Sequence, residues 1–186
     1  MHNVQGEDLF VIGICGKAGA GKTAFAKYII EQFLSLTDNK IGCTIVPFAR
    51  ALKDMALDMG WDGKKDEKGR RLLQLLGTDV CRDCIDENYW VKKWRDALIR
   101  ETTKGIQLII ADDVRFGNEV LCINELGGHI YHVVGRAYNL KGEAEAHPSE
   151  NSLITKNMNR IDNSSTFEAL ECRAIDVVKG LIKWTY

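Results

Sequence analysis

Eight residues near the N-terminus have the composition of a phosphate-binding loop. The run Gly16-Lys17-Ala18-Gly19-Ala20-Gly21-Lys22-Thr23 fits the pattern G-x-x-x-x-G-K-[ST] at every fixed position. The glycines let the backbone turn so that successive N–H groups point at phosphate oxygens, and a helix beginning near Lys22 adds the positive end of its dipole. Lys22 would reach the β- and γ-phosphates, and Thr23 would offer a hydroxyl ligand to Mg²⁺. The pattern predicts a nucleoside triphosphate site and leaves open whether the γ-phosphate goes to water or to an acceptor.

Two adjacent carboxylates follow a second apolar run. Asp112 and Asp113 come directly after Ile109-Ile110-Ala111, which places both at the C-terminal end of a predicted strand, where ligands of open α/β sheets bind. Both are candidate Mg²⁺ ligands and catalytic residues, although one of them could instead cap the helix that starts at Arg115. Arg115 would project from the same strand end toward the phosphates, with an ion pair to Asp112 or Glu119 as the alternative.

Candidate acceptor-binding residues lie between these two motifs. Arg50 and Lys53 are one helical turn apart and could together receive an acceptor phosphate, or they could be solvated surface charges. Gln74 could hydrogen-bond the edge of a base, although a glutamine on a helix surface is the equally simple interpretation. Tyr89 and Trp90 could stack on a base, but Trp90 also fits a core stripe together with Trp94. Residues 64–71 carry a local excess of positive charge, which is also typical of a charged helix start.

The elements that must position these residues alternate between strand and helix. Short apolar or β-branched runs predict strands at 9–15, 41–48, 106–111, 129–134 and 160–163, and helical periodicity predicts helices at 22–36, 49–60, 70–85, 89–103, 116–126 and 166–184. Residues 62–68 are expected to be a polar loop, and residues 137–159 a loop or lid. This alternation predicts an α/β fold with a mostly parallel sheet and right-handed crossovers.

Composition limits the classes of protein and partner. The chain has 186 residues, 45% of them hydrophobic, and its two prolines mark no domain boundary, so we treat residues 1–186 as one domain. Its 25 Lys and Arg residues balance 26 Asp and Glu, which disfavours stable binding to nucleic acid. The apolar run at 9–15 is too short for a membrane span and lacks a basic leader, so we expect a cytoplasmic protein with no membrane partner.

With these residues in place, the chain resembles the phage-type deoxynucleoside monophosphate kinases, a branch of the P-loop kinases. The resemblance spans most of the length and rests on segments that occur in the same order in that family. They are the glycine-rich run at 16–23, P-F-A-R-A-L-K at 47–53, L-Q-L-L-G-T-D at 73–79 followed by Arg82, N-Y-W at 88–90, D-D-V-R-F-G-N-E at 112–119 and H-P-S-E at 147–150. Gly117 stands where the family usually has proline, a small departure.

The resemblance implies a P-loop NTPase three-layer sandwich with about five parallel strands. It also implies a helical acceptor-binding region at about 49–104 and a lid at about 137–159. The implied reaction is transfer of the γ-phosphoryl group of ATP to a deoxynucleoside monophosphate, with Mg²⁺. Phe48 and Arg82 then join the acceptor site, and Arg136 becomes a candidate transition-state arginine, with a structural salt bridge as its alternative. The location would be the host cytoplasm if a phage encodes the protein.

Two other functions stay open at this point. A P-loop kinase could act on another small acceptor such as dephospho-coenzyme A, because the fold alone does not separate acceptors. A nucleotide-binding regulatory module is a second alternative, although a guanine-reading N-K-x-D segment is missing from the sequence. The accepted base, the preference for deoxyribose and the oligomeric state, a homodimer included, are also left open.

Overall fold

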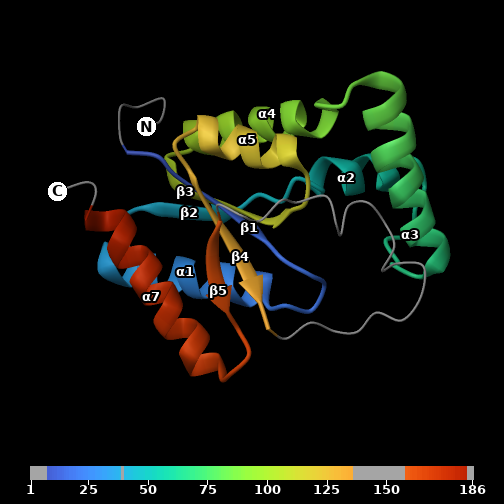
Figure 1. Cartoon of the computed structure of the whole chain (residues 1–186). Coiled ribbons are helices and arrows are strands. Elements are labelled where there is room, and N and C mark those ends of the chain that lie inside the picture. Colours follow the sequence, from blue (N-terminus) through green and yellow to red (C-terminus); the bar gives the residue numbers. More distant parts are fainter. Residues whose placement is uncertain (1–7, 39, 136–157, 184–186) are drawn as a thin grey trace.

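Parallel strands form the centre of the fold. The computed structural model describes residues 8–38, 40–135 and 158–183 of the chain. Within these residues, one sheet has the order β2-β3-β1-β4-β5, and every neighbouring pair is parallel (Figure 1). The strands are β1 (Phe10–Cys15), β2 (Gly42–Ile45), β3 (Ile106–Val114), β4 (His129–Val134) and β5 (Asn159–Asp162). The prediction of an α/β fold with a parallel sheet is confirmed.

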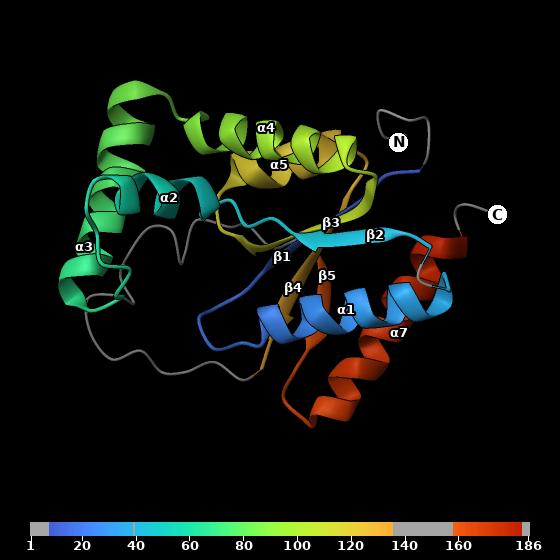
Figure 2. The same ribbon diagram turned by 180° about the vertical axis from the view of Figure 1, so that it is seen from behind.

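Helices cover both faces of this sheet. Helices α1 (Lys22–Leu36) and α7 (Phe167–Lys183) pack on one face, and α4 (Tyr89–Thr103) and α5 (Gly117–Glu125) lie on the other (Figures 1 and 2). Alternate residues of a strand point to opposite faces, so each strand is apolar on both sides. In β3, Leu108 and Ile110 belong to the core beneath α1 and α7, whereas Ile109 and Ala111 belong to the core beneath α4.

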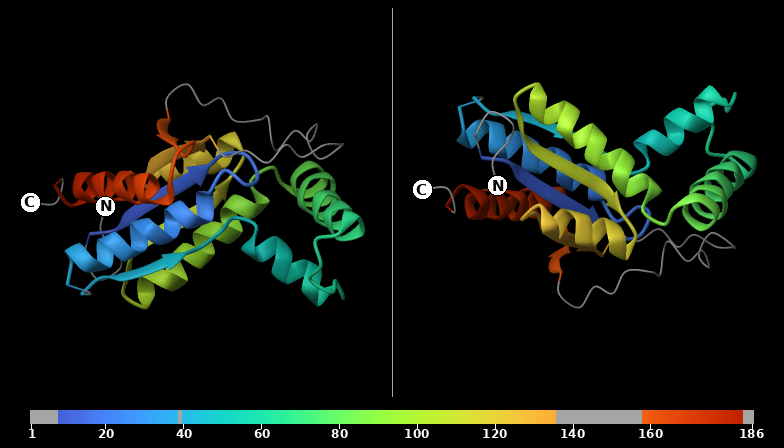
Figure 3. Two further views of the ribbon diagram at one scale, coloured as in Figure 1. Left: turned by 90° about the horizontal axis from the view of Figure 1, so that it is seen from below. Right: turned by 90° about the horizontal axis from the view of Figure 1, so that it is seen from above.

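A group of helices extends beyond the C-terminal ends of the strands. It consists of α2 (Arg50–Asp58), α3 (Glu67–Gln74) and a π-helix, η1 (Leu75–Ile85), and we call residues 50–85 the helical arm (Figure 3). The arm has a small core of its own, in which Ala56, Leu76 and Cys81 pack together with Trp90 of α4. The indole Nε1 of Trp90 donates to the carbonyl of Gly77 at 2.8 Å.

Several elements have the predicted bounds, and others differ for identifiable reasons. The helices at 22–36 and 89–103 and the strand at 129–134 are confirmed. The predicted strand at 41–48 ends at Ile45, because the carbonyl of Val46 accepts the indole N–H of Trp94 and the chain then turns toward α2. The apolar pattern continues to Phe48 because Val46 and Phe48 are buried, although the strand itself ends three residues earlier. In β3 the strand continues through both aspartates to Val114.

The predicted helix at 70–85 differs most. It begins at Glu67, inside the predicted loop at 62–68, because the carboxylate of Asp66 accepts the N–H of Gly69 at 2.8 Å and caps the helix. From Leu75 onward the helix is of the π type, a form concentrated at functional sites.

The predicted lid at 137–159 lies outside the described residues except for its last two positions, of which Asn159 begins β5. Arg136 and the H-P-S-E segment at 147–150 also lie outside the described residues. In the described part of the chain, no helix combines the length and the apolar character needed to cross a bilayer.

Candidate functional site

The glycine-rich loop joins β1 to α1 and turns sharply around the ammonium group of Lys22. Gly16 has φ 141°, and a Cβ there would lie 2.3 Å from the carbonyl oxygen of Val133 in β4. Only glycine fits this position without strain. The Nζ of Lys22 donates to the carbonyl oxygens of Gly16 at 2.7 Å and Lys17 at 2.9 Å. The lysine therefore lies against the loop that the motif predicts for phosphate binding.

A buried asparagine from the other end of the chain supports the same loop. Asn163, which follows β5 and is 2% exposed, donates from Nδ2 to the carbonyl oxygen of Ala20 at 2.8 Å. Gly21 has φ 98°, and a Cβ at Gly21 would lie 2.3 Å from that same Nδ2. Neither a motif nor periodicity distinguishes Asn163 in the sequence, so Asn163 was not predicted as a site residue.

The two adjacent aspartates point in different directions. Asp112 continues the alternation of Leu108 and Ile110 and therefore faces α1, where its Oδ2 accepts a hydrogen bond of 2.7 Å from the hydroxyl of Thr23. A carboxylate and a hydroxyl in contact are hard oxygen donors, which suit Mg²⁺ when substrate phosphates and water complete its coordination. Thr23 and Asp112 thus fit the predicted metal site.

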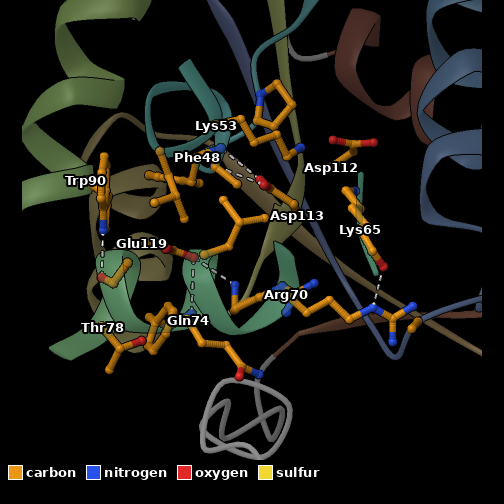
Figure 4. A pocket seen from close by; sticks show the side chains of 18 of the residues that line it. Phe48, Lys53, Lys65, Arg70, Gln74, Thr78, Trp90, Asp112, Asp113 and Glu119 are labelled. Atoms are coloured by element: carbon orange, nitrogen blue, oxygen red, sulfur yellow. Dashed lines mark hydrogen bonds between the residues drawn. The ribbon is translucent and has the colours of Figure 1, made fainter. Parts of the chain in front are cut away.

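Asp113 faces the opposite side of the sheet and interacts with backbone groups. Its Oδ1 and Oδ2 accept the N–H groups of Phe48 at 2.8 Å and Ala49 at 3.0 Å, just before α2 (Figure 4). Desolvation raises the pKa of this carboxyl, and the two backbone hydrogen bonds oppose that effect. Because both oxygens are engaged in this way, Asp113 is a poor fit to the predicted role of metal ligand. Its two hydrogen bonds come from residues that precede α2 and not from the first N–H groups of that helix, so Asp113 caps neither α2 nor α5.

Glu119 carries out the capping that was considered for the aspartates. Its side chain is 3% exposed, and its Oε2 accepts the N–H groups of Arg115 at 2.7 Å and Phe116 at 3.1 Å, at the start of α5. Its Oε1 forms an ion pair of 2.6 Å with Nη2 of Arg82 in η1. Burial raises the pKa of Glu119 to about 7, although the hydrogen bond from Arg115 and the charge of Arg82 oppose this.

Arg82, predicted to bind the acceptor, is held by several partners at once. Its guanidinium is paired with Glu119, donates to the carbonyl of Glu87 at 3.2 Å and to Asn118 at 3.3 Å, and lies 3.8 Å from the ring centre of Phe116. The arginine is 9% exposed. These contacts indicate a structural role for the guanidinium, at the wall of the pocket described next.

A pocket of about 570 Å³ lies between the glycine-rich loop, the end of β3 and the helical arm. At one end it is lined by Lys22, Thr23 and Asp112. Its remaining walls come from residues 47–49, from the arm, from α4 and from the segment 113–119 (Figure 4). The described residues thus bring the predicted triphosphate site and most of the predicted acceptor site into one continuous space.

Four cationic side chains line the middle of this pocket, namely Lys53, Lys65, Arg70 and Arg115. The charge of Lys53, burial, and the charges of Arg115 and Arg70 lower the pKa of Lys65. Lys65 therefore lies close enough to the other three cations for their charges to disfavour its own positive charge. An anion bound among them would relieve this repulsion and gain charge-assisted hydrogen bonds. The cluster therefore suits a phosphate group.

The far end of the pocket is apolar and aromatic. Phe48 and Trp90 line the pocket there, and each is 3% exposed. Phe48 is supported from behind by Trp94, with ring centres 4.6 Å apart. The amide of Gln74 and the hydroxyl of Thr78 also line the pocket there (Figure 4). An aromatic wall with a few polar groups is typical of a site for a flat heterocycle.

Two predicted acceptor residues do not line the pocket. Arg50 is exposed outside it, although Lys53, one turn later, lines it. Tyr89 packs edge-on against Trp90, with ring centres 4.8 Å apart, and supports that side chain from outside the pocket. Lys65 and Arg70 were noticed only as part of a local positive excess, which shows neither their orientation nor their proximity to Arg115.

Comparison with known proteins shows which family the chain is similar to. Residues 36–174 match the sequence profile of the family described as Deoxynucleotide monophosphate kinase. A protein of Acanthamoeba polyphaga mimivirus, named for that activity, is 28% identical over 167 residues, which cover 76% of this chain and 81% of the relative. The deoxynucleotide monophosphate kinase of Enterobacteria phage T4 is 34% identical over 65 residues, covering 35% of this chain and 27% of the phage protein.

Solved structures share the fold at low sequence identity. The APS kinase CysC of Mycobacterium tuberculosis, in complex with AMPPNP and APS, aligns with a TM-score of 0.57 and 10% identity over 92% of this chain and 98% of that one. TT1252 from Thermus thermophilus aligns with a TM-score of 0.59 and 18% identity over 94% and 99% of the two chains. These likenesses show the fold, a three-layer sandwich of the P-loop NTPase type.

Proposed function

The chain belongs to the deoxynucleotide monophosphate kinase family, and we propose that it transfers the γ-phosphoryl group of ATP to a deoxynucleoside monophosphate in an Mg²⁺-dependent reaction. The enzyme class, a phosphotransferase acting on nucleotides, follows from the family. The finer proposal rests on one continuous pocket that has the glycine-rich loop at one end, a cationic cluster in the middle and an aromatic wall at the far end.

Each part of that pocket has a role in the proposed reaction. The loop at 16–23 would bind the β- and γ-phosphates of ATP, with Lys22 as their charged partner. Thr23 and Asp112 would hold Mg²⁺, which neutralises charge on the phosphate oxygens when it is bound. Lys53, Lys65, Arg70 and Arg115 would bind the acceptor phosphate, and the wall containing Phe48 and Trp90 would contact its base.

The chemistry needs positioning more than a strong base. An oxygen of the acceptor phosphate forms a new P–O bond to the γ-phosphorus while the bond to the bridging oxygen of ADP breaks, so that a diphosphate and ADP result. Two anionic reactants must be brought close together, and a cluster of cations offsets their mutual repulsion. The helical arm together with α4, residues 49–104, is then the acceptor-binding region.

The test is a coupled assay of ADP release from Mg-ATP. Each deoxynucleoside monophosphate is compared with the matching ribonucleotide, with dephospho-coenzyme A and with no acceptor, and Lys22→Ala is the control. We expect release that depends on a deoxynucleotide and that falls by orders of magnitude in the variant. Release that needs no acceptor would indicate a nucleoside triphosphatase, and release with dephospho-coenzyme A alone would indicate the other kinase.

A further inference from the structure

The helical arm is tied to the sheet at both of its ends by carboxylates from one short segment. That segment, residues 112–119, runs from the end of β3 into α5. Its first aspartate bonds to Thr23 of the glycine-rich loop. The two other carboxylates of the segment, Asp113 and Glu119, make their hydrogen bonds at the beginning and at the end of the arm.

Asp113 holds the beginning of the arm. Its carboxylate accepts the backbone N–H groups of Phe48 and Ala49, the two residues that precede α2. Because both bonds go to the backbone, they fix the direction in which the chain leaves the sheet. The side chain of Phe48, immediately next to this attachment, is part of the pocket wall.

Glu119 holds the end of the arm through Arg82. The ion pair of 2.6 Å links α5 to η1, and both side chains are less than 10% exposed. Arg82 also donates to the carbonyl of Glu87, and Asn118 donates from Nδ2 to that same carbonyl at 3.0 Å. The other oxygen of Glu119 accepts the backbone N–H of Arg115, so the same carboxylate fixes one of the pocket's cations.

We propose that Asp113 and Glu119 are positioning residues that set the helical arm, and the acceptor bound to it, relative to the phosphoryl donor. This inference rests on the proposed function. The segment 112–119 then connects the two substrate sites mechanically, since it contacts Thr23 on the donor side and holds the arm on the acceptor side. Neither carboxylate needs to touch a substrate in this role.

The kinetic test uses neutral isosteres. Asp113→Asn and Glu119→Gln each replace one carboxylate oxygen by an NH₂ group, which faces N–H donors and cannot accept their hydrogen bonds. We expect kcat/KM for the deoxynucleotide to fall about 10–100-fold, because small misplacement of a reactant is costly, while KM for ATP stays within about threefold. Glu125→Gln is the matched control, since Glu125 of α5 pairs with Arg95 of α4 at the protein surface.

A second measurement follows local opening of the helical arm directly. Hydrogen–deuterium exchange of peptides from 67–85 is expected to become faster in both variants, while exchange in α1 and α7 stays as in the wild type. A purely structural role would instead lower the active fraction and leave both KM values and the local exchange pattern unchanged. Where Glu119→Gln does not fold, Arg82→Lys replaces it, because lysine keeps the charge facing Glu119 but loses the fork that also reaches Glu87 and Asn118.

The outcomes separate this inference from the proposed function. If the wild type transfers phosphate and both variants behave like Glu125→Gln in KM values and exchange, the positioning role is wrong and the function stands. If the wild type transfers no phosphate to any nucleotide, the proposed function is wrong, and the exchange data still decide whether the two carboxylates hold the arm. If Arg82 and Glu119 act as a unit, the double variant Arg82→Met with Glu119→Gln should lower kcat/KM for the deoxynucleotide no further than the more damaging of the two single variants.

Discussion

The hydroxyl of Thr23 donates a 2.7 Å hydrogen bond to Oδ2 of Asp112, so that the first turn of α1 meets the end of β3. This contact identifies Asp112, and not the adjacent Asp113, as the carboxylate that lies beside Thr23. Strand alternation sends Asp112 toward the glycine-rich loop, and it sends Asp113 toward the backbone that leads into α2. Two neighbouring carboxylates of one strand therefore belong to two different parts of the site.

Thr23→Val should weaken the use of Mg-ATP, because valine has the shape of threonine but neither bonds Asp112 nor offers an oxygen to Mg²⁺. A hydrogen bond to a charged group contributes about 1.5–3 kcal/mol, so we expect kcat/KM for ATP to fall about 10–100-fold. Steady-state rates over a range of Mg²⁺ concentrations measure this. Thr23→Ser, which keeps the hydroxyl, should stay close to the wild type, and equal losses in both variants would remove the hydroxyl from the metal site.

Lys65→Ala should weaken binding of the acceptor more than binding of ATP. Lys65 lies in the cationic cluster, and the charges of Lys53, Arg115 and Arg70 lower its pKa. Loss of one charged hydrogen bond to phosphate, about 1.5–3 kcal/mol, predicts an acceptor KM raised about 10–100-fold. Lys64→Ala is the control, because Lys64 is exposed and pairs with Asp62 at 3.2 Å. Identical acceptor KM values in the two variants would place the phosphate elsewhere.

Gly16→Ala should disrupt the loop itself. An alanine there would have φ near 141° and a Cβ about 2.3 Å from the carbonyl oxygen of Val133, a backbone atom that cannot easily move. Strain of this kind costs about 1–3 kcal/mol before any clash is counted, so urea denaturation should show a clear loss of stability. Gly180→Ala in α7 meets no atom within 4 Å and should stabilise the protein by about 0.5–1 kcal/mol. Equal stability of the two variants would contradict the close approach.

The alternating strands and helices and the glycine-rich loop could be predicted from the sequence because both depend on local signals. The apolar stripe of α1 and the apolar run of β4 gave correct bounds, and the spacing of Gly16, Gly21 and Lys22 identified the loop. Strand alternation predicts that Asp112 and Asp113 face opposite sides of the sheet. It does not show which side α1 covers, because residues 108–111 are apolar on both faces, and only the structure assigns Asp112 to the α1 side.

The acceptor side could be predicted only in part, because it depends on long-range contacts. Arg82 matched a segment of the family, but its ion pair with Glu119 joins residues 37 positions apart and is invisible to spacing. Leucine periodicity predicted a helix over η1 without distinguishing a π-helix from an α-helix, and this difference changes which side chains of the arm face the pocket. Arg50 fitted a helical face together with Lys53, yet only Lys53 lines the pocket.

His132 should contribute a loss of stability in mild acid. This histidine lies in β4 opposite Cys15, and burial together with the charges of Arg160 and Lys22 lowers its pKa below the usual 6.5. The unfolded chain then binds the proton more readily than the folded one, so stability is fully present above about pH 6.5 and is lost as pH falls through the lower folded value.

His132→Gln, which carries no titrating group, should remove this part of the pH dependence. Urea denaturation from pH 7.5 down to 5 is expected to show the wild type losing more of its free energy of unfolding than the variant, and NMR titration of the imidazole gives its pKa directly. Lys22→Met should move that pKa upward, because it removes one of the positive charges that oppose protonation. Parallel stability curves for the wild type and His132→Gln, or an imidazole pKa at or above 6.5, would show that the folded environment does not disfavour the charged ring.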